Sequence, residues 1–292
     1  MNRKWIFIMF AGWVTFQIGL FVSGNIVGPA VQHIGLTGDY RVLIQGIVLS
    51  CIAVPIGLYL YQQFYYQTNG RPENPVYSLK RVNHLLTGII FVIILVVIGI
   101  ILAMLAGTSL EWQSPNVWLG AVLLNILVAF LFEALPEELI FRGLIYDVLS
   151  HRLHTWTAVL LQTLLFTLGP AVLLLIQSIF GFDVGVNANI FYFVLLFFFG
   201  IVLQLIRVWT GSLWSSIGFH LAFLITQRFT VTKEFSQIAD WPPIIVYNDK
   251  ITGLAEGLVL EMMIIGGILI LLLILGVRRM KRRSQNQLRK NS

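Results

Sequence analysis

Charged residues are scarce in this sequence. Of its 292 residues only 11% are Asp, Glu, Lys or Arg, while 58% are hydrophobic. Soluble domains carry about 25% charged residues. The mean hydropathy of +0.85 agrees with this contrast. The composition therefore excludes an ordinary soluble domain and predicts an integral membrane protein.

Cysteine is almost absent. Cys51 is the single cysteine, and it lies inside an apolar run. One cysteine excludes an intrachain disulfide. We expect Cys51 to be a small apolar core residue without a reactive role.

The excess of positive charge is confined to one place. The net charge is +6, but most of the excess lies in the C-terminal tail, directly after an apolar segment. Basic residues beside a membrane span orient that span. The charge therefore indicates membrane topology and contact with lipid, and we expect no nucleic-acid partner.

Long apolar runs define the expected fold class, an all-α polytopic membrane protein with about eight transmembrane helices. We expect a Gly169-Pro170 pair to break or kink the fifth of them. Loops are expected at 25–39 and, more polar, at 62–85. The predicted spans are Trp5–Val22, Val42–Tyr61, Leu85–Leu105, Val117–Leu135, Trp156–Phe180, Asn189–Val208, Thr210–Thr226 and Leu254–Val277.

The positions of Lys and Arg predict the orientation. With the N-terminus in the cytoplasm, an even number of spans also places the 62–85 loop and the basic tail there. These segments hold most of the cations, as the positive-inside rule requires. We therefore expect a multi-pass protein of the cell membrane with both termini cytoplasmic.

The stretch from Glu133 to Gly143 is the most informative one, because it places acids and an arginine at the end of an apolar run. Ionisable groups at that depth are costly and indicate function. In a helix, Glu138 and Arg142 stand four apart in the favourable order for an ion pair. Glu133 and Glu137 are also four apart and repel each other. Repulsion in a low dielectric favours the protonated carboxyl, which suits Glu137 to proton transfer.

Two simpler interpretations remain open at this point. The four charged residues could form only an ion-pair network at a helix end on the membrane surface. His220, the one histidine inside a predicted span, could be a packing residue, or it could form a weakly indicated nucleophile pair with Ser216, one turn earlier. A divalent metal is a candidate cofactor only through His220 and the glutamates, and no other cofactor is indicated.

The order and spacing of several motifs resemble a known family. Glu137-Glu138-x-x-x-Arg142-Gly143 is followed by an apolar helix, then by Thr210-Gly211-Ser212-Leu213-Trp214 and a helix bearing His220. This arrangement is similar to the CPBP (CAAX protease and bacteriocin-processing, or Abi) intramembrane proteases. We divide the chain into N-terminal spans (1–116), a CPBP-like core (117–227) and a last span with its preceding loop and basic tail (228–292).

The resemblance implies a helical bundle with an active site inside the bilayer. Glu137 would activate the attacking water, supported by Glu138 and Arg142, and His220 would begin the family's third motif. Two expected groups are substituted. Pro170 stands where the second motif, beginning at Phe166, has histidine, and Leu224 stands where the third has Asn or Asp. Neither side chain can donate or accept a hydrogen bond.

The substitutions would weaken proteolysis. Loss of one oxyanion donor costs about 10²–10³ in turnover, and loss of a partner to the general base costs about 10²–10⁴. His151 and His154 are too far along the chain to replace the missing imidazole. Gln227 and Thr167 could offer only an amide or a bound water.

Three functions follow. The first is a glutamic-type intramembrane endopeptidase of reduced or lost activity, acting on a peptide or membrane protein. The second is a degenerate member that binds a peptide or protein, as an immunity or regulatory factor. The third, a transporter or channel, would need polar residues on several helices, and the third and sixth spans have almost none. We expect Glu137, Glu138, Arg142 and His220 to converge in one pocket in the cytoplasmic half of the membrane.

Overall fold

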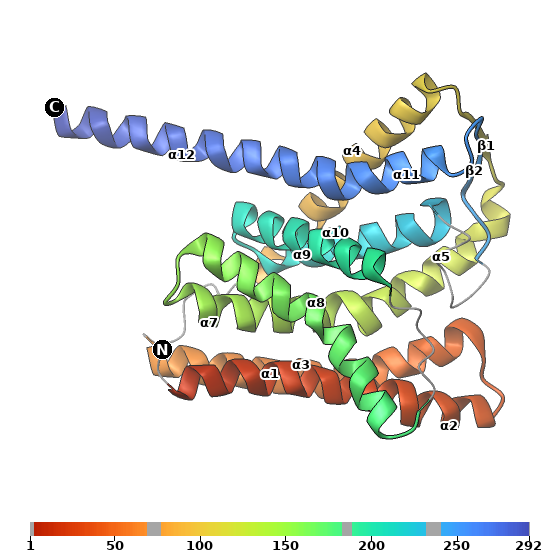
Figure 1. The fold of residues 1–292 in the computed structure, drawn as a ribbon, viewed down its shortest axis with the longest axis horizontal. Coiled ribbons are helices and arrows are strands. Elements are labelled where there is room, and N and C mark those ends of the chain that lie inside the picture. Colours follow the sequence, from red (N-terminus) through yellow and green to blue (C-terminus); the bar gives the residue numbers. More distant parts are fainter. Residues whose placement is uncertain (1–2, 69–76, 183–188, 232–240, 292) are drawn as a thin grey trace.

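The computed structural model describes residues 3–68, 77–182, 189–231 and 241–291. Within them the chain is a bundle of helices with one small two-stranded sheet (Figure 1). The elements are α1 (Arg3–Phe21), η1 (Val22–Val27), α2 (Gly28–His33), α3 (Gly38–Thr68), η2 (Leu79–Arg81), α4 (His84–Leu105), β1 (Ser109–Trp112), α5 (Pro115–Ala129), η3 (Phe130–Ala134), α6 (Leu135–Glu137), η4 (Glu138–Ile145), α7 (Tyr146–Ser150), α8 (Thr155–Ile179), α9 (Ile190–Thr210), α10 (Leu213–Thr226), η5 (Gln227–Val231), β2 (Ile245–Asn248), α11 (Leu254–Glu261), η6 (Met262–Gly266) and α12 (Gly267–Asn291).

Seven continuous helices in the described part of the chain are long and apolar enough to cross a membrane. They include all of the predicted spans except Thr210–Thr226. The protein is therefore an all-α polytopic membrane protein, as the composition predicted. The spans are Lys4–His33, Gly38–Thr68, Leu79–Leu105, Pro115–Ser150, Thr155–Ile179, Ile190–Thr210 and Leu254–Gln287.

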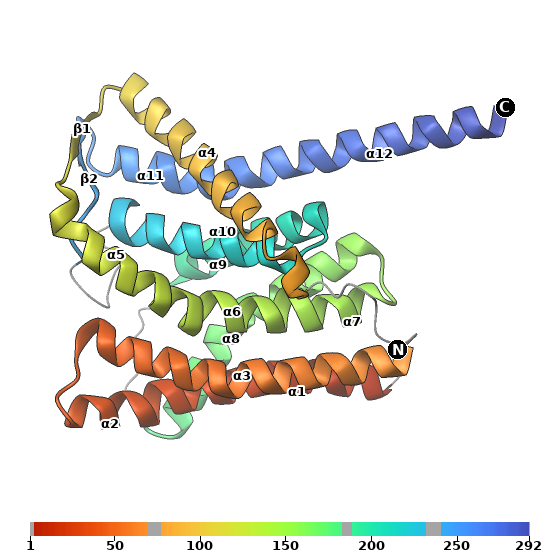
Figure 2. The same cartoon turned by 180° about the vertical axis from the view of Figure 1, so that it is seen from behind.

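The missing eighth span is α10, which continues into η5 as one helix from Leu213 to Val231 but is not apolar enough to count as a span. It packs against α4, α5, α9 and η4, so protein surrounds much of it. Figure 2 shows it running along the middle of the bundle. Its polar residues Ser215, Ser216 and His220 are buried inside the protein, which explains both its low hydropathy and the departure from the predicted count.

Two glycines allow α10 to approach α4 closely. A Cβ atom on Gly88 would lie 2.1 Å from the carbonyl oxygen of Ser215, and one on Gly218 would lie 2.1 Å from that of Leu85. No side chain fits at either distance, so the two backbones touch directly. This contact fixes the position of α10, and with it the position of His220.

Several predicted boundaries were wrong. The predicted loop at 25–39 is mostly helical, because η1 and α2 continue the first span to His33. The first part of the predicted 62–85 loop belongs to α3, which runs to Thr68, and residues 69–76 lie outside the described residues. Pro170 does not break α8, which is continuous from Thr155 to Ile179, although Figure 1 shows that this helix bends.

Cys51 is exposed on the outside of α3, so its predicted place in the core was wrong. The surrounding run is apolar because that surface belongs to a membrane-spanning helix. In such a helix an apolar sequence indicates contact with lipid as readily as burial in protein.

The two ends of the bundle differ in charge. Figures 1 and 2 show both chain termini at the same end, which we call the terminus end; the antiparallel β1–β2 sheet lies at the opposite end, the hairpin end. Arg41, Arg228 and Lys250 lie towards the hairpin end. The described cations at the terminus end are Lys4, Lys80, Arg81, Arg152, Arg207, Arg278, Arg279, Lys281 and Arg282.

Candidate functional site

The acidic stretch lies in the middle of one long helix, not at a helix end. The helix runs without a break from Pro115 to Ser150, 36 residues. It contains two π-helical segments, η3 and η4, on either side of α6. Such π turns occur often at functional sites. The stretch is therefore not a network at a helix end, and Glu138 and Arg142 are fully buried inside the protein.

Glu138 is the centre of the buried polar cluster. Arg142 Nη1 lies 3.2 Å from its Oε1 atom. His220 Nδ1 lies 2.9 Å from the same oxygen, and the hydroxyl of Ser216 donates to Oε2. The predicted Glu138–Arg142 pair is thus present. A buried carboxylate with this many partners is satisfied and held in one orientation.

The spacing of residues on two helices produces this cluster. Glu138 and Arg142 are four residues apart in η4, and Ser216 and His220 are four apart in α10, so each pair lies on one face. Ser216 Oγ is also 3.2 Å from the carbonyl oxygen of Leu203, which links the cluster to α9. The hydroxyl of Ser216 therefore supports Glu138, and it makes no hydrogen bond to His220 of the kind that a nucleophile pair would need.

Aromatic rings pack against the side chains of Arg142 and His220. The guanidinium carbon of Arg142 lies 3.9 Å from the centre of the Phe166 ring. The His220 ring packs edge to face against Phe199, with 5.0 Å between the ring centres. Cation–π contacts of this kind are stronger when water is excluded. Both side chains are therefore fixed before any ligand arrives.

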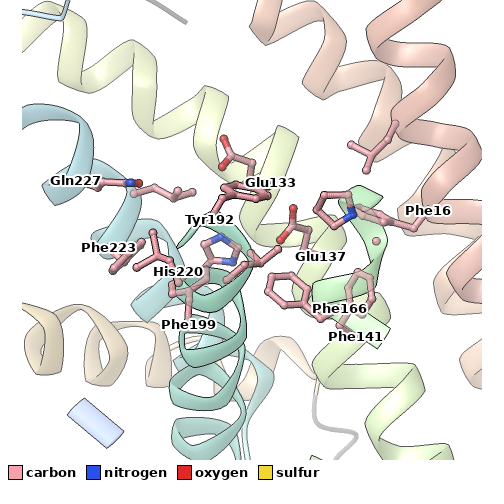
Figure 3. A pocket seen from close by; sticks show the side chains of 16 residues that line it. Phe16, Glu133, Glu137, Phe141, Phe166, Tyr192, Phe199, His220, Phe223 and Gln227 are labelled. Atoms are coloured by element: carbon pink, nitrogen blue, oxygen red, sulfur yellow. The ribbon is translucent and has the colours of Figure 1, made fainter. Parts of the chain in front are cut away.

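Beside the cluster lies a pocket of about 810 Å³ of empty space. Glu137 and His220 both line it, and so do Phe166, Pro170 and Leu224, the remaining positions that the family motifs single out. Figure 3 shows the charged and aromatic side chains around it. The structure therefore brings the predicted residues together, with Glu138 and Arg142 behind the pocket wall.

The pocket lies on the hairpin side of the buried cluster, and its placement in the cytoplasmic half of the membrane stays a prediction. Glu133, Tyr192 and Gln227 line the pocket too. On their helices, Glu133 lies nearer to the hairpin end than Glu137, and Tyr192 lies nearer to it than Phe199. In the same way, Gln227 lies nearer to the hairpin end than His220. The pocket thus extends from the cluster towards the hairpin end, away from the termini. The sequence could not reveal this, because depth along a helix does not say on which side a cavity lies.

His151, His154 and Thr167, which were considered as substitutes for the expected histidine, do not line the pocket. His151 packs against Trp5 with 4.8 Å between ring centres, and His154 caps α8, its Nδ1 atom accepting from the amide of Trp156 at 3.4 Å. Thr167 donates to the carbonyl oxygen of Thr163. Of the candidates considered, only Gln227 lines the pocket.

Sequence reasoning missed two further residues at the pocket. Tyr192 lines the pocket and interacts electrostatically with Glu137 and Glu133. Arg228, just outside, donates to Glu133 and, at 2.8 Å, to the side-chain oxygen of Asn125. The sequence does show that Glu133, one turn before Glu137, needs a cationic partner. It does not identify that partner, because Arg228 lies 95 residues away in the chain.

The histidine, cysteine and acidic side chains of the described ranges form no cluster typical of a metal site. No three or more of them are grouped so that they could hold an ion. Glu133, Glu137 and His220 are the candidate ligands that line the pocket.

The fold and the site define a polytopic membrane protein with a carboxylate–histidine cluster beside a pocket inside the helical bundle. Residues 118–226 match the family model described as type II CAAX prenyl endopeptidase Rce1-like. The chain thus contains an Rce1-like domain of the CPBP family, and the family that the motifs resembled is confirmed. No curated protein matches the chain.

Proposed function

We propose that this protein is an intramembrane endopeptidase in which Glu137 activates a water molecule. The observation that carries the proposal is a division of labour between adjacent glutamates. Glu138 is engaged by Arg142, Ser216 and His220, whereas Glu137 lines the pocket. A general base must reach the proton that it removes, and of the two residues only Glu137 lines the space that a substrate could occupy.

In the proposed reaction, the Glu137 carboxylate takes a proton from water as the oxygen attacks the peptide carbonyl carbon. The carbonyl oxygen becomes an oxyanion, the tetrahedral intermediate collapses, and the proton passes to the leaving nitrogen. Like-charge repulsion from Glu133 is moderated by its ion pair with Arg228. The pair therefore tunes how readily Glu137 accepts a proton.

His220 is proposed to stabilise the oxyanion. Its Nδ1 atom is occupied by Glu138, so Nε2 is the nitrogen left for a ligand in the pocket. A protonated histidine donates from both nitrogens, so in that form Nε2–H donates to the oxyanion while Nδ1–H donates to Glu138. A donor aimed at developing negative charge in a site that excludes water contributes strongly to catalysis.

The pocket walls support a peptide with apolar side chains as the substrate. They include Phe16, Phe141, Phe166, Phe199 and Phe223, together with leucines. Pro170 and Leu224 add apolar surface at the positions where the family motifs have polar groups. We therefore propose a slow enzyme, in which Tyr192 and Gln227 are the remaining neutral hydrogen-bond donors of the wall.

A second candidate function is peptide or protein binding without cleavage. The observation that favours it is that both substituted positions, Pro170 and Leu224, face the pocket itself. An apolar wall there would strengthen the binding of an apolar segment by about 25 cal/mol per Å² buried, while removing two groups used in catalysis. The same fold would then hold a ligand as a regulatory or immunity factor.

The test compares protein termini in membranes of cells that express the wild type, Glu137→Gln or the control Glu111→Gln. Glu111 is an exposed acid on β1, so the control makes the same chemical change outside the pocket. We expect new termini with the wild type and the control and none with Glu137→Gln. Identical termini in all three, at equal expression, would reject proteolysis in favour of binding.

A further inference from the structure

The terminus side of the buried cluster is closed. Between this cluster and the terminus end, η4 and α9 contribute four fully buried side chains, those of Leu144, Ile145, Leu203 and Ile206. One turn further on, Asp147 binds both Arg207 and the hydroxyl of Tyr61. This packed layer joins α3, α7 and α9 on the terminus side of the cluster.

The hairpin side of the pocket, in contrast, has a polar rim. Glu133, Tyr192 and Gln227 line the pocket there, and Arg228 directly follows Gln227. Arg228 also lines a second, larger cavity of about 1330 Å³ at the hairpin end, together with Trp241 and Asp249. Polar groups at this rim can be satisfied by water, so the pocket leads towards a hydrated surface.

The charge of the two ends sets the orientation in the membrane. Cations are concentrated at the terminus end, whereas the hairpin end carries the acids Asp39, Glu111, Asp249 and Glu256. The described cations of the hairpin end are Arg41, Arg228 and Lys250, of which Arg228 is paired with Glu133. By the positive-inside rule the terminus end faces the cytoplasm, and the hairpin end then faces the other side.

The pocket wall also selects against anions. It contains the carboxylates of Glu133 and Glu137 and no Lys or Arg side chain. Two carboxylates in one cleft repel further anions, and His220 is the one titratable group of the wall that could offset them. Phospholipid phosphates and free peptide carboxylates are therefore disfavoured, whereas a neutral or basic polypeptide segment with apolar side chains fits the aromatic walls.

We infer that the pocket receives such a polypeptide segment from the extracytoplasmic side of the membrane. Whether this segment is cut rests on the proposed function, but the side from which it enters does not. The ligand class is thus the exported part of a membrane or secreted protein. A cytoplasmic chain end carrying a free carboxylate does not fit.

The exposed Cys51 makes a direct test simple, since Cys51→Ala leaves a full-length protein without cysteine. Single cysteines are then introduced at the pocket rim (Gln227→Cys and, separately, Tyr192→Cys), at an exposed hairpin residue (Asn248→Cys) and in the exposed tail (Ser284→Cys). Intact cells are treated with the small, membrane-impermeant, cationic thiol reagent MTSET before and after permeabilisation. Gel filtration in detergent checks that each variant is folded.

We expect both rim cysteines and Asn248→Cys to react in intact cells, and Ser284→Cys to react only after permeabilisation. We also compare the rate of reaction with MTSET to that with the anionic reagent MTSES. We expect this rate ratio to be about tenfold higher for the rim cysteines than for Asn248→Cys, since fields in charged clefts alter association rates by about 10–10³. Reaction of Ser284→Cys in intact cells would overturn the orientation. Rim cysteines that stay unreactive while Asn248→Cys reacts would overturn the route, and a preference for MTSES would overturn the ligand class.

These outcomes are separable from the failure of the proposed function. Labelling does not depend on catalysis. A protein that cleaves nothing but reacts from outside would therefore support the inference and reject the proposed protease activity. A protein that cuts, but whose rim reacts only after permeabilisation, would do the reverse.

Discussion

His220 and Glu138 face each other across the contact between α10 and η4, with 2.9 Å between Nδ1 and Oε1. The two residues are 82 positions apart in the chain. Glu138 binds both Arg142 and His220. The histidine ring is therefore held by Glu138, and the neighbouring Glu137 stays available to the pocket. The arrangement separates residues that hold the site from residues that face a ligand.

Arg142→Ala should destabilise the protein more than Glu137→Ala. Removing one member of a buried pair leaves an uncompensated charge, which costs about 3–5 kcal/mol, whereas Glu137 borders an open pocket. Thermal unfolding in detergent would measure the difference, with Arg279→Ala, an exposed arginine, as the control. Equal stability of the Arg142 and Glu137 variants would contradict the role of Glu138–Arg142 as a brace.

Ser216→Ala should cost stability but leave most of the activity. The variant loses a hydrogen bond to a charged group, worth about 1.5–3 kcal/mol, but no proposed catalytic atom. Turnover of a substrate found by the terminus comparison should stay within about tenfold of wild type, a change of about 1.4 kcal/mol. Loss as complete as in Glu137→Gln would revive the serine as a nucleophile.

Leu224→Asn should raise peptidase activity. The residue lines the pocket, the family resemblance implies Asn or Asp at this position, and one oxyanion donor is worth about 10²–10³ in turnover. The matched control is Leu224→Met, which keeps the volume without a donor. Cleavage rates that rise in neither variant would show that the absent amide does not limit this protein, and rates that rise equally would point to packing.

Gly88→Ala should disrupt the site from a distance. The added Cβ would meet the backbone of α10 at 2.1 Å, so α10 must move away from α4 and carry His220 with it. Overpacking costs about 1–3 kcal/mol, and here the obstacle is backbone that cannot rotate away.

Gly120→Ala is the control for this variant, because a Cβ atom there has nothing within 4 Å. The control should be as stable as wild type or slightly more so, since Ala favours helix over Gly by about 1 kcal/mol. Circular dichroism melts and cleavage rates of the two variants would test both expectations. A Gly88→Ala protein with unchanged stability would show that α4 and α10 can adapt.

The sequence by itself determined the features that depend on local composition and spacing. Scarcity of charge required a membrane protein, apolar runs located most of the spans, and the four-residue interval predicted the Glu138–Arg142 pair, because a helix places such residues on one face. The motif from Glu137 to Arg142, followed by the helix bearing His220, was specific enough to identify the family.

Only the tertiary structure decided what depends on contacts between distant segments. It placed His220 and Ser216 on Glu138, gave Glu133 a partner in Arg228, and put Pro170 and Leu224 in the pocket wall. It also set the burial of α10 and the exposure of Cys51, because hydropathy does not distinguish a surface facing lipid from one facing protein. The side of the cluster on which the pocket opens follows from how α4, α5, α9 and η4 pack around α10, and no local pattern encodes it.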